Sequence, residues 1–340
     1  MMTQRFLITG GAGFIGSNFI LSLLAKYPRI HITNVDSLTY AGNLENLKSV
    51  ESDPRYRFYR AAIENRDAMM SIFDEAKPDV VVHFAAESHV DRSILDGRPF
   101  VISNVLGTQT LLDCAKVRGV AKFVHVSTDE VYGTLGETGV FTEETPLAPN
   151  SPYSASKAGS DLLVRAYYET FNMPCVITRC SNNYGAYQFP EKLIPLMITN
   201  ALYDLPLPVY GEGLNIRDWI HVEDHCHGVE LAVEKGIPGQ VYNLGGESER
   251  RNIDIVKQIL AILGKPESLI THVQDRLGHD FRYAMGIQKA RKELGFEPKY
   301  TFEKGLASTV EWYLNHESWW QAIKSGDYLH YYQKQYGEHV

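Results

Sequence analysis

A glycine-rich turn at residues 10–16, with the sequence GGAGFIG, constrains the fold of this chain more than any other feature. A strand-like apolar run at 6–9 precedes it, and a helix-like run begins at Phe14. Without Cβ atoms the backbone turns tightly and approaches a pyrophosphate closely, and the N-terminus of the following helix favours the phosphate charge. The turn therefore predicts the start of a dinucleotide-binding sheet, although the motif alone is weak.

Asp36 supplies a second element of the same signature. It closes the next strand-like run, twenty residues after Gly16. A carboxylate there accepts hydrogen bonds from an adenosine ribose and repels a 2′-phosphate, so the residues predict NAD rather than NADP. The alternative is a glycine turn and a strand-end Asp that bind no ligand.

The first half of the chain alternates short β-rich runs with longer helical patterns. This alternation predicts a parallel sheet covered by helices on both faces, that is, a Rossmann-like, doubly wound α/β fold. Strands are expected at 6–9, 30–35, 56–59, 80–84, 123–127 and 175–179, and helices from residue 14 and at 66–75, 100–118 and 153–171.

The second half changes character, because prolines interrupt its apolar segments and glycines mark turns. We expect an NAD-binding Rossmann domain at 1–180 and a smaller C-terminal α/β substrate lobe at 181–340. A helix is expected at 219–234 and a strand at 241–244. Segments near 214–245 are expected to rejoin the large sheet.

Composition disfavours two classes of partner. At 340 residues and 44% hydrophobic content, the chain is long enough to bury a sizeable core. A formal net charge of −8 disfavours a surface that neutralises a nucleic-acid backbone, and no apolar run approaches the ~18 residues of a bilayer span. We therefore expect no nucleic acid and no membrane as partners.

Cysteine usage and the N-terminus indicate a compartment. The four cysteines show no Cys-x-x-Cys spacing, and residues 1–5 run into the first strand without a signal-type apolar region. We expect reduced thiols and a cytoplasmic protein.

Tyr153 and Lys157 form a Tyr-x-x-x-Lys pair at the start of a predicted helix, so they share one helix face. A free phenol, with a pKa of about 10, is a poor base at neutral pH, but a nearby ammonium and an oxidised nicotinamide ring both favour the phenolate. Tyr153 is therefore a candidate base that removes a hydroxyl proton as hydride leaves the same carbon. The spacing is common by chance, and a solvated helix face is the alternative.

Two adjacent carboxyls, Asp129 and Glu130, follow Thr128 at the end of a predicted strand, where open α/β sheets place ligands. Simple alcohol oxidation does not need them. If burial keeps one protonated and the other stays ionised, the pair can eliminate water from a sugar that has been oxidised to a ketone. Glu130 would remove the acidified hydrogen and Asp129 would protonate the departing hydroxyl. A solvated acidic turn is the alternative.

With these residues the chain resembles the extended short-chain dehydrogenase/reductases and, within them, the dTDP-glucose 4,6-dehydratase family over nearly its whole length. Asp129 discriminates most, since relatives that only epimerise usually carry Ser at this position. The resemblance is carried by the segments 9–16, 36–43 (DSLTYAGN), 83–93 (HFAAESHVDRS), 128–130 (TDE) and 179–185 (RCSNNYG).

The resemblance implies a hydro-lyase that makes dTDP-4-dehydro-6-deoxy-glucose from dTDP-glucose by C4 oxidation, water elimination across C5 and C6 and hydride return to C6, with NAD regenerated. It implies that Tyr153 is the base at C4, that Lys157 orients the ribose and tunes Tyr153, and that Thr128 positions the C4 hydroxyl. Glu130 would take the C5 proton, and Asp129 would protonate the leaving C6 hydroxyl.

The resemblance also implies two sets of binding residues. Arg217 and Arg276 are the expected diphosphate ligands, because guanidinium groups match phosphate oxygens in geometry and charge, and a surface Arg is the alternative for each. The expected cofactor-binding residues are Gly10, Gly13, Phe14, Ile15, Gly16, Asp36, Ser37, Leu38, Thr39, Ala62, Ile63, Ala85, Ala86, Tyr153, Lys157 and Asn183. The expected substrate-binding residues are Ser88, Thr128, Asn182, Lys192, Leu193, Pro208, Val209, Tyr210, Arg217, Asn252, Arg276, His279 and Tyr283.

The family pattern further implies a homodimer through a four-helix interface formed by the helices near 100–118 and 153–172. Some positions depart from that pattern, because Ala62 replaces a usual Asp, Ser103 a usual Thr and Leu277 a usual Pro. None of them belongs to the acid, base or hydride machinery.

Two further signals are interpreted as structural. His221, His225 and His227 are spaced wrongly for a zinc motif, and no metal is expected. A late aromatic cluster is expected to pack a C-terminal helix on the substrate lobe, and its members are Trp312, Tyr313, Trp319, Trp320, Tyr328, Tyr331 and Tyr332.

Other functions stay open at this point. A UDP-sugar 4-epimerase-like isomerase needs the same cofactor residues but neither carboxyl, and a 4,6-dehydratase acting on another nucleotide hexose needs both. A nucleotide-sugar or dinucleotide sensor would bind without turnover.

Overall fold

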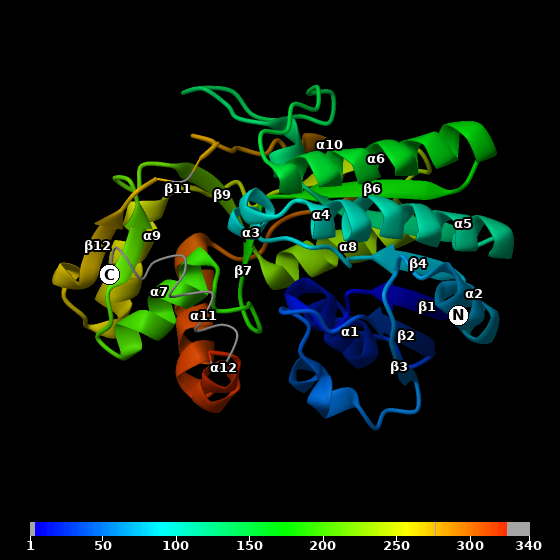
Figure 1. Cartoon of the computed structure of the whole chain (residues 1–340), viewed down its shortest axis with the longest axis horizontal. Helices are drawn as coiled ribbons and strands as arrows, with labels where there is room; N and C mark the ends of the chain where they lie inside the picture. Colours follow the sequence, from blue (N-terminus) through cyan, green and yellow to red (C-terminus); the bar gives the residue numbers. More distant parts are fainter. Residues whose placement is uncertain (1–3, 276, 325–340) are drawn as a thin grey trace.

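The structure, a computed structural model, describes residues 4–275 and 277–324 (Figure 1). Its larger part is built on a seven-stranded sheet in the order β10-β6-β5-β4-β1-β2-β3, in which every neighbouring pair is parallel. The strand order reverses beside β1, as in a doubly wound Rossmann-like sheet, so the predicted fold class is confirmed. The strands are β1 (Gln4–Thr9), β2 (Ile30–Asp36), β3 (Tyr56–Arg60), β4 (Val80–His83), β5 (Lys122–Thr128), β6 (Cys175–Cys180) and β10 (Val241–Leu244).

Side chains of these strands alternate between two separate hydrophobic cores. Phe6 and Ile8 of β1 join one core, whereas Leu7 between them joins the other. Val81 of β4 lies in the same core as Leu7. Successive residues of a strand point to opposite faces, so nearly continuous apolar runs are what a sheet buried on both sides requires.

Helices cover both faces of this sheet (Figure 1). Helices α1 and α8 pack together against one core, and α2, α5 and α6 pack against the other. The helices of this part are α1 (Phe14–Lys26), α2 (Arg66–Ala76), α3 (Val90–Leu95), α4 (Arg98–Phe100), α5 (Thr108–Arg118), α6 (Pro152–Phe171), α8 (Val222–Lys235) and α10 (Gln288–Leu294), with the 3₁₀ turns η1 (Leu44–Val50) and η3 (Asp129–Tyr132).

The helix predicted at 100–118 contains a wider turn. Residues Val101–Gly107 form a π-helical segment, η2, between α4 and α5. Asn104 is buried in this segment, and its side-chain amide donates to the Glu87 carbonyl and to the Ser156 hydroxyl. The π segment therefore ties the residues that follow β4 to helix α6.

The smaller lobe contains a three-stranded sheet, β11-β9-β7, and a two-stranded sheet, β12-β8. Helices α7, α9 and α11 enclose a core of their own, in which Leu196, Ile259 and Leu306 are buried. Its elements are β7 (Asn182–Tyr184), α7 (Leu193–Leu202), β8 (Leu207–Tyr210), β9 (Ile216–His221), β11 (Glu249–Arg251), α9 (Asn252–Leu263), η4 (Glu267–Leu269), β12 (Ile270–Val273), α11 (Phe302–Asn315) and α12 (Glu317–Ile323).

The prediction of a helix at 219–234 is wrong for residues 219–221. Strand β9 continues through His221, because it hydrogen-bonds to both β7 and β11. Helix α8 then begins at Val222, where the His221 side chain caps it by accepting the Glu223 N–H at 3.4 Å. The strand predicted at 241–244 is β10, which pairs with β6 at the edge of the large sheet.

The predicted packing of a C-terminal helix on the smaller lobe is confirmed for α11 and α12. The aromatic side chains that contact the lobe core are Trp312, Tyr313, Trp319 and Trp320. The other members of the predicted cluster lie outside the described residues, namely Tyr328, Tyr331 and Tyr332.

None of the helices in the described ranges combines the length and apolar character needed to cross a bilayer.

Candidate active site

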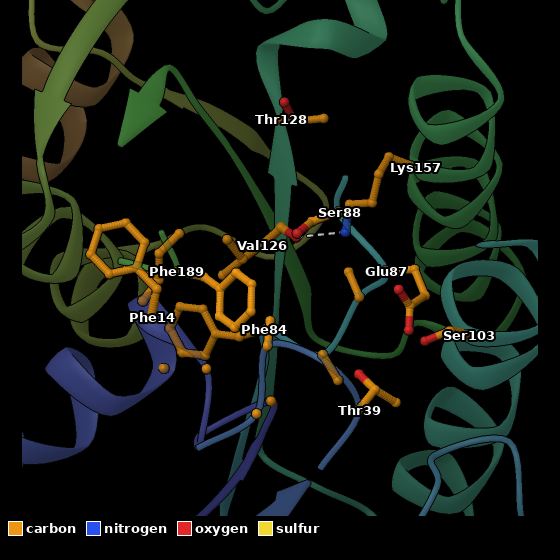
Figure 2. Close-up of a pocket in the computed structure, with 18 of the residues that line it drawn as sticks. Phe14, Thr39, Phe84, Glu87, Ser88, Ser103, Val126, Thr128, Lys157 and Phe189 are labelled. Atoms are coloured by element: carbon orange, nitrogen blue, oxygen red, sulfur yellow. Dashed lines mark hydrogen bonds between the residues drawn. The ribbon is translucent and has the colours of Figure 1, made fainter. Parts of the chain in front are cut away.

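A cavity of about 300 Å³ lies at the carboxyl ends of the large-sheet strands. The glycine-rich turn, the segments after β2 and β4, the end of β5, the start of α6 and residues 180–192 form its wall. In Figure 2, Thr128 and Lys157 lie toward one end of the cavity and Phe14 and Phe84 toward the other. All predicted catalytic residues line it, namely Thr128, Asp129, Glu130, Tyr153 and Lys157.

The glycine-rich turn is packed directly against backbone atoms at Gly10 and Gly16, so neither position has room for a side chain. Gly10 has a φ of +71°, and a Cβ there would lie 2.6 Å from the backbone nitrogen of Ala85. A Cβ on Gly16 would lie 2.3 Å from the Gly10 carbonyl oxygen. The compact turn brings the start of helix α1, Phe14 and Ile15, to the cavity wall, which is the arrangement that favours a pyrophosphate.

Two main-chain donors hold the side chain of Asp36. Its Oδ2 accepts the Ala12 N–H at 3.0 Å, and its Oδ1 accepts the Leu38 N–H at 2.8 Å. Burial raises the pKa of Asp36, and the two hydrogen bonds oppose that shift. Each carboxylate oxygen keeps a further acceptor site, so the fixed side chain fits the two hydroxyls of an adenosine ribose.

Most of the predicted cofactor residues share this cavity, and together they fit a dinucleotide. Leu38 and Ala62 do not line the cavity, although Leu38 contributes its N–H to Asp36. Besides Tyr153 and Lys157, the residues that line it are Gly10, Gly13, Phe14, Ile15, Gly16, Asp36, Ser37, Thr39, Ile63, Ala85, Ala86 and Asn183.

Asp129 is a buried carboxyl whose surroundings favour its protonated form. Its Oδ1 accepts the Thr128 hydroxyl at 3.2 Å, whereas its Oδ2 has no hydrogen-bond partner among the described residues. Burial raises the pKa of Asp129 well above its ordinary value, and the charge of Glu130 raises it further. A neutral carboxyl with one unpaired oxygen at the cavity is able to donate a proton to a bound sugar.

Thr128 fixes the position of the second carboxyl. Its hydroxyl oxygen caps the 3₁₀ turn η3 by accepting the Glu130 N–H at 3.3 Å. Glu130 is partly exposed, in contrast to Asp129, which is 2% exposed. The end of β5 therefore presents one carboxyl whose pKa burial raises beside one that has access to solvent.

Tyr153 stands in the first turn of α6, where Ser151 and Ser154 form a capping box. Burial raises the pKa of its phenol well above the ordinary value, and the charge of Glu130 raises it further. An interaction with the Thr128 hydroxyl acts in the opposite direction. The phenolate therefore needs a compensating positive charge close to it.

Lys157 is buried, and its Nζ donates to the Val126 carbonyl oxygen at 2.8 Å (Figure 2). Burial lowers its pKa to about 8, and the charge of Asp161 opposes the shift. Asp161 itself forms a buried ion pair with Arg179, with 2.8 Å between Oδ2 and Nε. A pKa of about 8 leaves most of the Lys157 side chain protonated at neutral pH.

The residues predicted to bind substrate divide into two groups. Lys192 joins the cavity wall through its Nζ, which donates to the Ser88 carbonyl at 2.9 Å. The cavity lining contains Ser88, Thr128, Asn182 and Lys192. The lining does not contain Leu193, Pro208, Val209, Tyr210, Arg217, Asn252, His279 or Tyr283. Arg276 lies outside the described residues.

Part of the second group is nevertheless assembled. The Arg217 guanidinium lies 4.2 Å from the centre of the Tyr283 ring, and it donates to the Asp280 carbonyl at 2.8 Å. The rings of Tyr210 and His279 meet edge to face, 6.1 Å apart between centroids. The structure therefore groups these residues pairwise, without bringing them into the lining of the cavity.

Sequence reasoning missed a charged cluster in the cavity wall. Tyr40, Glu87 and Glu191 line the cavity, and burial raises the pKa of each. Arg92 joins them, 4.1 Å from the centre of the Tyr40 ring and 3.1 Å from a Glu191 oxygen. Tyr40, Glu87 and Arg92 belong to segments that carry the family resemblance, so the signal was present, but Glu191 stands outside those segments.

The histidines rejected as metal ligands have other contacts. His225 is buried and shares a hydrogen bond between its Nδ1 and the Oδ1 of Asn183 at 2.8 Å. Burial lowers the pKa of His225 to about 3, so its ring is neutral and helps to hold Asn183 in the cavity wall. Within 4–275 and 277–324, no three His, Cys, Asp or Glu side chains come together as metal ligands would.

The chain is similar to nucleotide-sugar dehydratases over nearly its whole length. The sequence family described as GDP-mannose 4,6 dehydratase matches residues 7–309. A dTDP-glucose 4,6-dehydratase of Xanthomonas campestris pv. campestris (strain B100) is 51% identical over 341 residues, covering 95% of this chain and 97% of the relative. The crystal structure of a dTDP-glucose 4,6-dehydratase from Bacillus anthracis str. Ames in complex with NAD has a TM-score of 0.89 and 52% identity, covering 94% of this chain and 100% of that one. A dTDP-glucose 4,6-dehydratase from Streptomyces venezuelae with NAD bound has a TM-score of 0.92 and 50% identity, with the same coverage.

Proposed function

The chain belongs to the dTDP-glucose 4,6-dehydratase family of NAD-dependent hydro-lyases, and from this premise we propose that Thr128, Asp129, Glu130, Tyr153 and Lys157 carry the reaction. The enzyme converts dTDP-glucose to dTDP-4-dehydro-6-deoxy-glucose. Bound NAD supplies the hydride acceptor at C4 and, once reduced, the hydride donor at C6. One observation carries the proposal, namely that Asp129, a carboxyl whose pKa burial raises, and a partly exposed Glu130 share one cavity with the other three side chains.

The first step needs a base at the C4 hydroxyl. Tyr153 takes that proton as its phenolate, which the ammonium of Lys157 stabilises from the same face of helix α6. The Thr128 hydroxyl holds the C4 hydroxyl against the phenol. Burial and the charge of Glu130 both oppose the phenolate, so we assign the compensating positive charge to Lys157.

The second step loses water. A carbonyl at C4 makes the C5 hydrogen acidic, and the Glu130 carboxylate removes it. The C5–H electron pair forms the C5–C6 double bond while the C6–O bond breaks, and the Asp129 proton converts the departing hydroxyl to water. When C6 is reduced, Glu130 returns a proton to C5. At the end of the cycle Tyr153 has gained one proton and Asp129 has lost one. Proton exchange with solvent restores both groups to their starting states.

We place the nucleotide diphosphate beyond the cavity, toward Arg217 and Tyr283. The Arg217 guanidinium donates to the carbonyl oxygens of Asp280 and Phe281, at 2.8 and 3.4 Å. A diphosphate offers stronger, charged acceptors to the same donors, so we expect it to displace these carbonyls. We propose Arg276 and His279, from the chain segment that also contains Tyr283, as further ligands of the diphosphate.

We infer that the enzyme is a homodimer. Apolar side chains are exposed on the helices that carry the family interface: Val101 (55%), Leu106 (51%), Leu162 (57%) and Phe171 (49%). A second copy of the chain would cover them. Light scattering of the purified protein should give twice the chain mass of 38.4 kDa, and a monomer would contradict the inference.

We also place the enzyme in the cytoplasm. All four cysteines are buried and unpaired, which suits a reducing compartment. Cell fractionation tests this placement, and recovery of the protein with the cell envelope would contradict it.

Turnover with purified protein tests the activity. Mass spectrometry against a panel of dTDP-, UDP-, GDP- and CDP-hexoses should show loss of water from dTDP-glucose without net formation of reduced cofactor. In deuterated water, the product should carry deuterium at C5. An unchanged sugar, a 4-epimer or stoichiometric reduced cofactor would overturn the proposal.

A further inference from the structure

Trp319 reaches from the smaller lobe to the cofactor domain. Its neighbour Trp320 is buried in the lobe core, so helix α12 is anchored there. The indole Nε1 of Trp319 donates to Oδ1 of Asn46 at 2.9 Å. Asn46 belongs to η1, which follows the loop after β2. In Figure 1, α11 and α12 lie on the side of the smaller lobe that is nearest the N-terminal segments drawn in blue.

Asn46 continues this link to the glycine-rich turn. It is 2% exposed, and its Nδ2 donates to the Ala12 carbonyl oxygen at 3.0 Å. The Asn43 N–H donates to the same carbonyl at 2.9 Å. An indole N–H only donates and a main-chain carbonyl only accepts, so the two contacts fix the orientation of the Asn46 amide. Two hydrogen bonds in series therefore join Trp319 to the turn at Ala12.

The same aromatic cluster contacts a second wall of the cavity. The Tyr187 ring lies 6.0 Å from the ring of Trp319, and the Tyr313 hydroxyl donates to the Gln188 carbonyl. Gln188 lines the cavity, and its side chain donates to the Asn183 carbonyl at 2.9 Å. The cluster therefore supports both the glycine-rich turn and the wall that follows β7.

We propose that Trp319 and Asn46 are positioning residues that retain NAD through the catalytic cycle by tying the glycine-rich turn to the smaller lobe. The inference rests on the proposed function, in which the hydride taken from C4 returns to C6 of the same sugar. Loss of the cofactor between these steps leaves an oxidised sugar that the enzyme cannot complete. A turn tied to both lobes has to break these contacts before the pyrophosphate leaves, so the link slows release.

The substitution Trp319→Phe tests the link, because it keeps an aromatic ring and removes the N–H donor. Trp312→Phe is the matched control, since it shortens a ring in the same cluster that takes no part in the Asn46 contact. NAD-loaded protein is mixed with excess labelled NAD, and the release rate is measured. Trp319→Phe should release NAD about fivefold faster, as expected for one ordinary hydrogen bond, and Trp312→Phe should match the wild type.

Asn46→Leu removes both hydrogen bonds of the link and completes a double-mutant cycle. In that background Trp319→Phe should have no further effect on release. Wild-type release from Trp319→Phe, equal acceleration by Trp312→Phe, or full additivity with Asn46→Leu overturns the proposal. If Trp319→Phe does not fold, as judged by thermal melting, release from Asn46→Leu decides it.

A turnover assay distinguishes the proposed role of Trp319 in NAD retention from the dehydration reaction itself. With dTDP-glucose, Trp319→Phe should lose activity progressively and regain it when NAD is added. Release rates are measured without any sugar, so they remain interpretable even if the proposed dehydration is not observed.

Discussion

The ammonium nitrogen of Lys157 lies 2.8 Å from the carbonyl oxygen of Val126, which ties helix α6 to strand β5 beside the cavity. An uncharged amine still donates an N–H, so this hydrogen bond does not depend on the charge of Lys157. The stabilisation that we propose for the Tyr153 phenolate does depend on that charge. Deprotonation can therefore remove the electrostatic effect of Lys157 while its hydrogen bond to Val126 still holds the side chain in position.

Activity should fall as pH rises through about 8. Burial lowers the pKa of Lys157 to about 8, so the cation is present below this pH and lost above it. The pH profile of kcat, measured on holoenzyme with its NAD content checked by extraction, should show this limb. Lys157→Met should lower kcat by about 10² to 10⁴-fold and remove the limb from the residual activity. A flat wild-type profile up to pH ~10 contradicts this role.

Asp129→Asn should stop water loss while leaving C4 oxidation in place. The amide keeps the shape of the carboxyl but has no acidic proton to give to the C6 hydroxyl, so kcat should drop about 10² to 10⁴-fold. In a single turnover, reduced nicotinamide should accumulate and be visible by absorbance. Glu311→Gln, at an exposed position of α11, is the control and should behave as the wild type. Product formation at the normal rate by Asp129→Asn would exclude this acid.

Gly16→Ala should disrupt the cofactor site. The new Cβ would lie 2.3 Å from the Gly10 carbonyl oxygen, so the turn has to open, at a cost of about 1–3 kcal/mol. Thermal melting should show the lost stability, and isothermal titration should show weakened NAD binding. Gly136→Ala is the control, because a Cβ there has no neighbour within 4 Å and its φ is not positive. Equal NAD affinity of the two variants speaks against the close-packed turn.

Arg179→Met should destabilise the fold by about 3–5 kcal/mol, because it leaves Asp161 buried without its ion-pair partner. Burial raises the pKa of Asp161, but Arg179 and His125 outweigh burial and bring it to about 2, below its ordinary 3.8. The stabilisation is therefore present above pH ~4 and lost toward pH ~2.

Denaturant titration at several pH values checks this ion pair. The deficit of Arg179→Met should be largest near neutral pH and shrink as pH falls, because Asp161 without the Arg179 charge then takes up a proton. Arg179→Met combined with Asp161→Leu should recover part of the stability. A deficit that is independent of pH would assign the loss to packing alone.

Local patterns in the sequence were sufficient to predict the strands of the large sheet. The run Val80–Val82 alternates between two cores, and the turn at 10–16 joins a strand to a helix, so neighbouring residues specify both features. The end of β5 was predictable for the same reason, since apolar residues lead directly into Thr128 and the two carboxyls. The difference in burial between Asp129 and Glu130, which raises the pKa of Asp129, depends instead on tertiary packing.

Features that depend on distant partners were not predictable. Strand β9 displaced the first residues of an expected helix because β7 and β11 pair with it. The contact of Arg92 with Glu191 spans 99 residues, and that of Trp319 with Asn46 spans 273. The pattern of residues within a short stretch of sequence cannot indicate such contacts.

Strand β10 enters the large sheet only after the chain has passed through β7, α7, β8 and β9 of the smaller lobe. Neither half is consequently an uninterrupted stretch of polypeptide, and a fragment cut at residue 180 lacks an edge strand and the helix beneath it. The two halves therefore cannot be exchanged between relatives by joining fragments at a single position of the chain.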